Sequence, residues 1–361
     1  MDQSSDTPVR SVPQTAPARR IPALALVSSP LRLARDADPM PTAWSAALAE
    51  LAGWLGTETV FVPAPVAAAP VFAPWEGWSP AAFQHGGAAG LPNAQFVASY
   101  AIDHAGAEGR GHVDKVLISP HPATCGRADP EAATLPDTAT LRAMIRFAVA
   151  EGRARIAIIG DTRQCDALAA LRLGEDRALV PEWVALAKLA IEDALPALMV
   201  PGAPWDAIIA MPDLRGIIFT LLAETTGVRG PWPMLWHKRG LRHVTSEVRD
   251  EVSEHLPLDA PVLIQTLALT LQVAGRSRCA SRLHEGWARL RASGVTTPSR
   301  GSAAPYAQEL ADEDLIALLC ANSGETGRPV RAWQALKMQP VINSGSQIPS
   351  LRVISANLAN H

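Results

Sequence analysis

Side chains able to transfer protons at neutral pH are scarce in this 361-residue chain, which limits the chemistry it can perform. Its 32 basic residues include four lysines, and it has two tyrosines: Lys115, Lys188, Lys238 and Lys337, with Tyr100 and Tyr306. Lysine and tyrosine act as general acids and bases when their surroundings shift their pKa, whereas arginine stays protonated. Codon bias toward arginine is the simplest explanation of the counts, so the positions of these residues carry the argument.

A basic stretch between residues 229 and 249 is the densest group of candidate anion ligands. It holds Arg229, His237, Lys238, Arg239, Arg242, His243 and Arg249. Such a group can hold a phosphate, a carboxylate or an acidic partner. The alternative is a solvated loop whose charges are balanced by nearby acidic residues. Together with Arg215, which follows a predicted strand, we single out His237, Lys238 and Arg239 as the possible anion-binding residues.

A metal site or a cysteine nucleophile is not expected. His121 and Cys125 lie four residues apart, but Pro120 and Pro122 favour a loop and no third ligand is nearby. The four cysteines are scattered, without a CxxC pair or zinc spacing: Cys125, Cys165, Cys279 and Cys320. We therefore predict ordinary core cysteines in a reducing cytoplasm.

The composition indicates a globular protein without a nucleic-acid or membrane partner. The net charge of -3 and the pI near 6.3 argue against a broad nucleic-acid footprint. No apolar run reaches the roughly 18 residues of a membrane span. The N-terminal segment lacks the apolar region of a secretory signal, so we predict a cytoplasmic protein.

Strands and helices alternate along the chain, which predicts an α/β protein with a largely parallel sheet. Strands are predicted at 21–27, 60–62, 113–118, 155–159 and 205–210, and helices at 44–55, 137–149, 181–193, 212–222, 260–274, 277–292 and from 312. Residues 1–20 are predicted to be a disordered tail, 63–95 an unusually long loop, and 322–361 a loosely structured C-terminal extension.

Four segments, in this order, resemble the isocitrate and isopropylmalate dehydrogenases, the metal-dependent β-decarboxylating dehydrogenases. They are IRFAVAEGR at 145–153, WDAIIAMPDLRGII at 205–218, the apolar helix at 261–275 and GVTTP at 294–298. The second is similar to the family's "FDVIVTPNLFGDI" segment. The resemblance implies a two-lobed α/β fold with a largely parallel sheet and a central cleft.

The resemblance also implies a division into two lobes and an oligomeric state. The large lobe would comprise residues 21–97 plus 225–321, and the middle lobe, with the dimer contacts, residues 98–224. The family's dimer is built partly from helices of the middle lobe. We therefore expect a homodimer, or a hetero-oligomer with a related subunit.

The positions at which the family carries its catalytic groups hold other residues here. The stretch after strand 155–159, where the family has its lysine, reads Gly-Asp-Thr-Arg at 160–163, and the tyrosine region 121–127 has no tyrosine. The positions of two metal-binding aspartates are Ile217 and Leu221, which cannot bind Mg2+. The family's cofactor-loop pattern is absent from 247–259. We therefore expect no catalytic residues, no metal ligands and no cofactor.

Three functions remain open from the sequence. The first is a catalytically degenerate relative, a pseudoenzyme that acts as a structural or regulatory subunit. The second is a divergent NAD(P)-dependent 2-hydroxy-acid dehydrogenase with a relocated site, which would need NAD(P) and Mg2+. The third is a cleft-type binder of a small anionic metabolite. The missing lysine, tyrosine and aspartates favour the first, whereas the basic stretch favours the third.

Overall fold

The structure, a computed structural model, describes most of the chain between residues 31 and 337. The described residues are 31–35, 42–63, 70–85, 94–104, 112–127, 133–238, 241–249, 258–299, 307–321 and 329–337. The predicted strand at 21–27 and the tail at 1–20 lie outside them. No helix in these ranges is long and apolar enough to cross a membrane.

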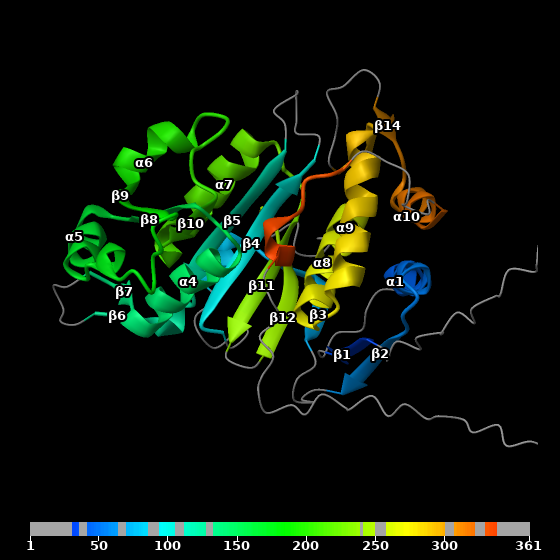
Figure 1. The fold of residues 1–361 in the computed structure, drawn as a ribbon, viewed down its shortest axis with the longest axis horizontal. Helices are drawn as coiled ribbons and strands as arrows, with labels where there is room; N and C mark the ends of the chain where they lie inside the picture. Colours follow the sequence, from blue (N-terminus) through cyan, green and yellow to red (C-terminus); the bar gives the residue numbers. More distant parts are fainter. Residues whose placement is uncertain are drawn as a thin grey trace, which may run out of the picture.

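A ten-stranded mixed sheet runs through the molecule (Figure 1). In sheet order its strands are β2 (Thr59–Pro63), β1 (Leu31–Arg35), β3 (Val71–Trp78), β12 (Leu241–Glu247), β11 (Trp232–Lys238), β4 (Phe96–Asp103), β5 (Val113–Pro120), β10 (Ala207–Ala210), β8 (Arg155–Gly160) and β9 (Ala185–Ala190). Pairing is antiparallel for β12 with β11, β11 with β4 and β4 with β5, and parallel elsewhere. The predicted fold class, α/β with a largely parallel sheet, is confirmed.

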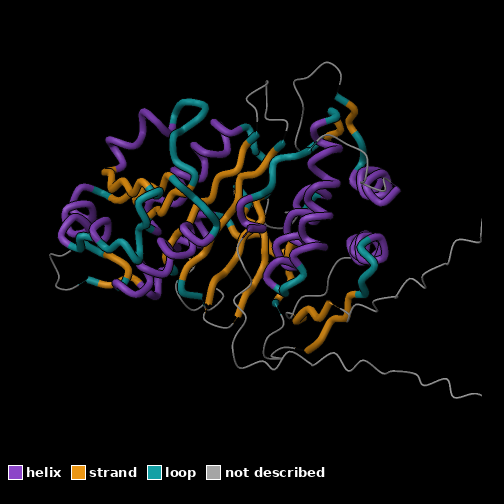
Figure 2. Tube along the Cα trace, in the orientation of Figure 1, coloured by secondary structure: helices purple, strands orange, loops and turns teal. Residues whose placement is uncertain are grey.

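Helices cover both faces of this sheet (Figure 2). They are α1 (Thr42–Trp54), α2 (Pro80–His85), α4 (Thr138–Ala150), α5 (Thr162–Ala170), α6 (Ile191–Leu198), α7 (Arg215–Thr226), α8 (Ala260–Val273), α9 (Ser277–Ala292) and α10 (Asp312–Ala321). Strand β8 shows why both faces need covering. Ile156 and Ile158 pack into one core with α4, whereas Ala157 and Ile159 pack into a second core with α6 and α7. A strand buried on both faces is expected to be apolar throughout.

Capping residues mark both ends of helices α4 and α8. The Asp137 side chain caps α4 by accepting the Thr140 N–H at 2.7 Å, and Asp259 caps α8 in the same way. Gly152 and Gly275 follow α4 and α8 with φ of 79° and 78°, a region that favours glycine. The predictions of α1, α4, α7, α8, α9 and α10, and of strands β2, β5, β8 and β10, are confirmed.

The long loop predicted at 63–95 is wrong in its middle part. Strand β3 and helix α2 lie there, and β3 pairs with both β1 and β12. Strand β3 contains Pro74, and proline is unfavourable in a central strand because it has no N–H for the ladder. The register shifts at this point, with Phe72 opposite Val244 and Gly77 opposite Ser246, so the proline sits in an irregular stretch. Ser246 donates to the Pro74 carbonyl at 2.6 Å.

The helix predicted at 181–193 is also wrong. Residues 185–190 form the edge strand β9, and α6 begins only at Ile191. The segment is rich in alanine and leucine, which favour helix, but β8 offers a parallel strand edge and its pairing prevails over local propensity. Strand β4, helix α5 and the hairpin β11–β12 were not predicted.

Part of the C-terminal stretch expected to be loosely structured is packed into the core. Trp333 is fully buried against Tyr100 and His284, with ring centroids 5.4 and 5.5 Å away. The Gln334 N–H donates to the Asp114 carboxylate at 2.8 Å. The segment 329–337 therefore belongs to the folded body. The predicted lobe division stays a prediction, and the sheet continues across its boundary from β11 to β4.

Candidate functional site

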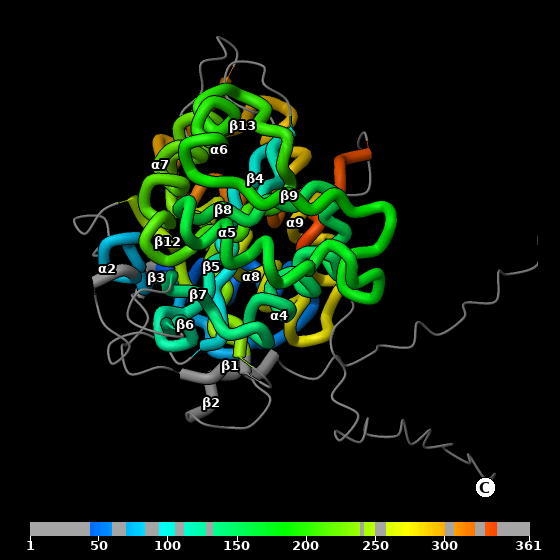
Figure 3. Tube along the Cα trace, turned by 90° about the vertical axis from the view of Figure 1, so that its left-hand side faces the viewer, coloured from blue at the N-terminus to red at the C-terminus, as the bar shows by residue number. Residues whose placement is uncertain are grey.

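The carboxyl ends of β5, β10 and β8 lie side by side and point the same way, so the loops that follow them converge. Because these three strands are parallel neighbours, residues 121–127, 161–164 and 211–213 meet at one edge of the sheet. A cavity of about 410 Å³ lies between them, and its polar lining includes Cys125, Arg127, Thr134, Asp161, Arg163 and Asp213. Ligands of open α/β sheets bind at such edges. Figure 3 looks onto this end of the molecule, with β6 (Cys125–Gly126) and β7 (Leu135–Pro136) near α4.

Asp161 faces this cavity but serves as the cap of α5. Its Oδ1 accepts the Gln164 N–H at 2.7 Å, and the Gln164 Oε1 accepts the Asp161 N–H at 2.8 Å. Gln164 also donates to the Thr134 carbonyl at 3.1 Å, which attaches the β7 loop to the same turn. This reciprocal arrangement is a capping box. The carboxylate that occupies the family's lysine region is therefore committed to holding the helix.

Replacing Asp161 by alanine is expected to lower the free energy of unfolding by about 1 kcal/mol, because the cap of α5 is lost and the Gln164 N–H loses its acceptor. Asp161→Ser should restore most of the loss, since serine is also a good cap. Asp166→Ala, at an exposed position on the same helix, is the matched control and should change stability by less than about 0.5 kcal/mol. Urea unfolding measures all three. Equal losses for Asp161→Ala and Asp166→Ala would contradict the capping role.

His121 and Cys125 do not form a nucleophile pair. The His121 Nδ1 accepts the Ala123 N–H at 3.1 Å, and the Cys125 sulfur lies 3.8 Å from the His121 carbonyl oxygen rather than against the imidazole. Burial raises the pKa of Cys125 to about 11, so the sulfur is a thiol at neutral pH and a weak nucleophile. In the described part of the chain, no three His, Cys, Asp or Glu side chains are grouped to hold a metal ion.

None of the described lysines, nor Tyr100, lines this cavity. Lys188 donates to the Leu168 carbonyl, and the Tyr100 hydroxyl donates to Glu151 at 2.6 Å inside the core. Tyr306 lies outside the described residues. Ile217 is 47% exposed on α7 and Leu221 packs on the α6–α7 core, so neither of these family metal positions lines the cavity.

Arg215, one of the predicted anion-binding residues, is fully buried, and each of its three nitrogens donates a hydrogen bond inside the protein. Its guanidinium forms a bidentate pair with Glu247 at 2.8 and 2.7 Å. Two more N–H groups donate to the hydroxyls of Ser119 at 2.8 Å and Ser99 at 2.7 Å. Sequence reasoning could not find these partners because Glu247 and the two serines lie on three other strands. Because Arg215 is fully buried and each of its three nitrogens already donates to a group inside the protein, it is not placed to bind an external anion.

The other predicted anion ligands lie at the opposite end of the β11–β12 hairpin. Glu247 is paired with Trp232 at one end of the ladder, whereas His237 and Lys238 lie at the other. Burial lowers the pKa of His237 to about 3, and its neutral ring stacks on Phe96 at 4.3 Å. Arg239 lies outside the described residues. The structure therefore does not bring Arg215 together with His237 and Lys238.

The basic stretch 229–249 contains strands of the central sheet rather than a solvated loop. Trp232 and Trp236, the two tryptophans of this stretch, are both buried. Sequence analysis did not single out the cavity arginines Arg127 and Arg163. The signal available was their position, nine and four residues after the predicted strands 113–118 and 155–159.

The comparisons with known proteins support the fold. No family model matches the chain, and no curated protein matches it in sequence. An isocitrate dehydrogenase structure from Methylococcus capsulatus is similar, with a TM-score of 0.56 and 11% identity over 81% of this chain and 98% of that one. The TT0538 protein from Thermus thermophilus is similar with a TM-score of 0.56 and 13% identity, over 86% of this chain and 72% of that one. At such identities the likeness shows an isocitrate dehydrogenase-like fold and nothing finer.

Proposed function

We propose that this protein is a catalytically degenerate relative of the isocitrate and isopropylmalate dehydrogenases that serves as a structural or regulatory subunit. One observation carries the proposal: the cavity at the carboxyl ends of β5, β10 and β8 is lined by Arg127 and Arg163 but by none of the described lysines or Tyr100. A proton shuttle needs a group whose pKa can be brought near the working pH, and a guanidinium stays protonated. Cys125 has a raised pKa and Asp161 is engaged as a cap.

An open strand edge, with exposed apolar residues in the neighbouring segments of the chain, supports the subunit role. Strand β9 pairs with β8 on one side only among the described strands. Near it in the chain, Trp183 is 54% exposed and Met199 64%, and Leu171 and Val200 are also exposed. An open strand edge with large apolar side chains is suited to pairing with another chain.

The partner is a second copy or a related subunit. Trp183→Glu should weaken this association, which light scattering measures as a lower average mass.

A second candidate function is binding of a small anionic metabolite in the same cavity. Arg127 and Arg163 are both exposed, and Arg127 is held by the Thr134 hydroxyl at 2.9 Å. Two guanidinium groups facing one cavity can hold a carboxylate or phosphate bidentately. In this candidate function Arg127 and Arg163 bind the anion, in place of the residues of the β11–β12 hairpin that the sequence suggested.

Thermal unfolding with ligands is expected to separate these functions. NAD or NADP with Mg2+ should leave the midpoint unchanged, with or without isocitrate or isopropylmalate. A stabilisation of several degrees by NAD plus Mg2+ would overturn the pseudoenzyme proposal in favour of a divergent dehydrogenase. Stabilisation by citrate alone, lost in the Arg127→Gln/Arg163→Gln variant but kept in Arg172→Gln, would support the anion binder. Arg172 is the control because it is an exposed arginine outside the cavity.

A further inference from the structure

The outer strand β9 presents an open backbone edge at one end of the sheet, with α5 packed on one face and α6 on the other (Figure 1). The Ala185 N–H donates to the Ala154 carbonyl at 2.8 Å, so Ala185 directs its backbone groups toward β8. Because these groups alternate along a strand, Leu186, Lys188 and Ala190 direct theirs away from β8. Within the described ranges, no strand lies beyond β9 to pair with them.

The usual protections of an edge strand are missing from β9. Exposed edges in natural proteins are commonly blocked by proline, by a bulge or by a charged side chain that points outward. Residues 185–190 contain no proline, and their register with β8 runs without a shift. The one charged residue of the strand, Lys188, is turned onto α5, where its Nζ donates to the Leu168 carbonyl at 3.0 Å. The backbone edge can therefore accept another strand.

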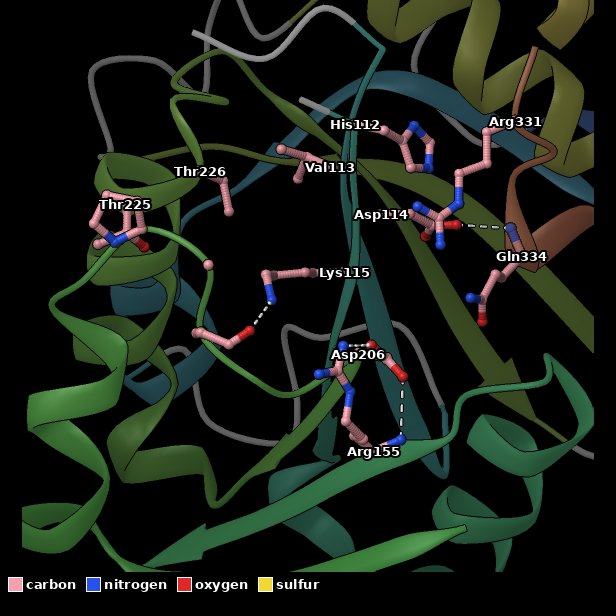
Figure 4. A pocket seen from close by; sticks show the side chains of 13 residues that line it. His112, Val113, Asp114, Lys115, Arg155, Asp206, Thr225, Thr226, Arg331 and Gln334 are labelled. Atoms are coloured by element: carbon pink, nitrogen blue, oxygen red, sulfur yellow. Dashed lines mark hydrogen bonds and ion pairs between the residues drawn. The ribbon is translucent and has the colours of Figure 1, made fainter. Parts of the chain in front are cut away.

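The one charged residue of the adjoining strand β8 is compensated as well. This residue, Arg155, lies opposite Ala185 in the ladder. It pairs with Asp206 at 3.0 Å, beside a cavity of about 350 Å³ where the strands begin (Figure 4). Two residues before β9, the Trp183 side chain is 54% exposed. Backbone groups without a strand partner and an exposed apolar ring next to them in the chain favour contact with another polypeptide.

The sequence of β9 is compatible with pairing to itself. Two antiparallel registers would bring most of the strand opposite the same strand of a second copy across a two-fold axis. A register centred on Lys188 sets two like charges directly opposite each other, which is unfavourable. A register centred on Ala187 sets Lys188 opposite Leu186 of the second copy. These two residues have outward-directed backbone groups and form the hydrogen-bonded pairs, whereas the Ala187 residues form the closer, non-hydrogen-bonded pair at the axis.

We propose that the protein forms a homodimer by antiparallel pairing of β9 with β9 of a second copy, centred on Ala187, so that the two sheets become one. A two-fold dimer requires both copies to contribute the same surface, and an edge strand with this charge pattern does so. The inference rests on the subunit role proposed above and names its partner and its contact. It does not depend on whether the cavity with Arg127 and Arg163 binds an anion.

A charge swap at the dimer axis tests this pairing on the intact chain. Ala187→Glu sets two carboxylates opposite each other and should raise the dimer dissociation constant by about fivefold or more in sedimentation equilibrium. Ala187→Lys should have the same effect. An equimolar mixture of the two variants should recover the dimer because opposite charges then meet, and this recovery also shows that both variants are folded. Ala292→Glu, at an exposed position at the end of α9, is the matched control and should leave the dissociation constant unchanged.

Cysteine cross-linking reads the register. In the register centred on Ala187, the two Cα atoms at the axis are about 4.5 Å apart, a distance that a disulfide can span. Mild oxidation of the Ala187→Cys variant should therefore link most of the dimer through this position, as identified by peptide mass spectrometry. Lys188→Cys should not cross-link. The opposite result, a cross-link through position 188 only, would overturn the register.

The remaining outcomes distinguish this contact from the subunit role. A protein that stays monomeric at every concentration reached, or a dimer that Ala187→Glu leaves unchanged, would overturn the pairing of β9 with itself. Either result leaves the subunit role in place, with another surface or a related subunit as the contact. Stabilisation by NAD with Mg2+ would instead overturn the subunit role, whatever the oligomeric state.

Discussion

Replacing Arg215 by methionine is expected to lower the free energy of unfolding by about 3–5 kcal/mol, the usual cost of removing one partner of a buried ion pair. Glu247, which is as deeply buried as Arg215, would be left with its charge uncompensated in the core. The hydroxyls of Ser99 and Ser119 would lose their donor at the same time. Urea unfolding at neutral pH measures the loss.

Two further variants distinguish the buried pair from a general effect of removing an arginine. Arg229→Met breaks an exposed pair with Glu224, 3.0 Å apart, and should cost no more than about 1 kcal/mol. The double variant Arg215→Met/Glu247→Leu should recover part of the loss, because it also removes the unpaired carboxylate. A loss in Arg215→Met no larger than in Arg229→Met would contradict the role assigned to the buried pair.

Acidification is expected to destabilise the protein through a cluster of three histidines, of which His284 is buried and His104 and His112 are partly buried. The His104 and His284 Nε2 atoms are 3.0 Å apart, and the His112 ring centroid lies 4.7 Å from that of His104. Burial, followed by the neighbouring imidazoles, lowers the pKa of His104 to about 4 and that of His284 to about 3. Asp103 and Asp114 act in the opposite direction on His104 but do not offset the burial.

The sign of the effect follows from proton binding. Unfolded histidine titrates near pH 6.5, so between 6.5 and about 4 the unfolded chain binds more protons than the folded chain. The free energy of unfolding therefore falls as the pH falls through this window, and is unaffected by these groups above it. One such histidine contributes a loss of about 2–3 kcal/mol at pH 4.5 relative to pH 7.

A matched pair of histidine variants tests this assignment. His284→Asn removes one member of the cluster and should flatten the decrease in stability between pH 7 and 4.5, whatever its effect at neutral pH. His243→Asn removes a histidine that lies 3.6 Å from Glu76 rather than against other imidazoles, and should keep the steep decrease. Urea unfolding at several pH values gives both slopes. Identical slopes in the two variants would show that carboxylates, not this cluster, cause the acid sensitivity.

Local patterns predicted those parts of the fold whose signals lie within a few residues. Helices α4 and α8 begin at capping aspartates and are followed by a left-handed glycine. Strand β8 is an apolar run because both of its faces are covered. The order of four sequence segments that resemble the isocitrate and isopropylmalate dehydrogenases indicated such a fold, and the structural likeness supports it at 11% identity.

Local patterns failed where pairing across the sheet outweighs propensity. Residues 185–190 are good helix formers but add to the edge of β8, and Pro74 is tolerated in β3 because the ladder is irregular there. The partners that decide these segments lie between about 30 and 170 residues away in the chain. A short stretch of sequence therefore does not contain both a segment and the strand that pairs with it.

The sequence by itself determined which chemical groups are available: four lysines, two tyrosines and four cysteines without zinc spacing. Only the tertiary structure decided what those groups do, because burial and pairing depend on residues distant in the chain. It commits Arg215 to Glu247, removes Tyr100 from solvent and partly buries His237. It also places the Lys115 amine between two backbone carbonyls and buries it, and the burial lowers its pKa. Desolvation, which sets these pKa values, is a property of the folded core and not of composition.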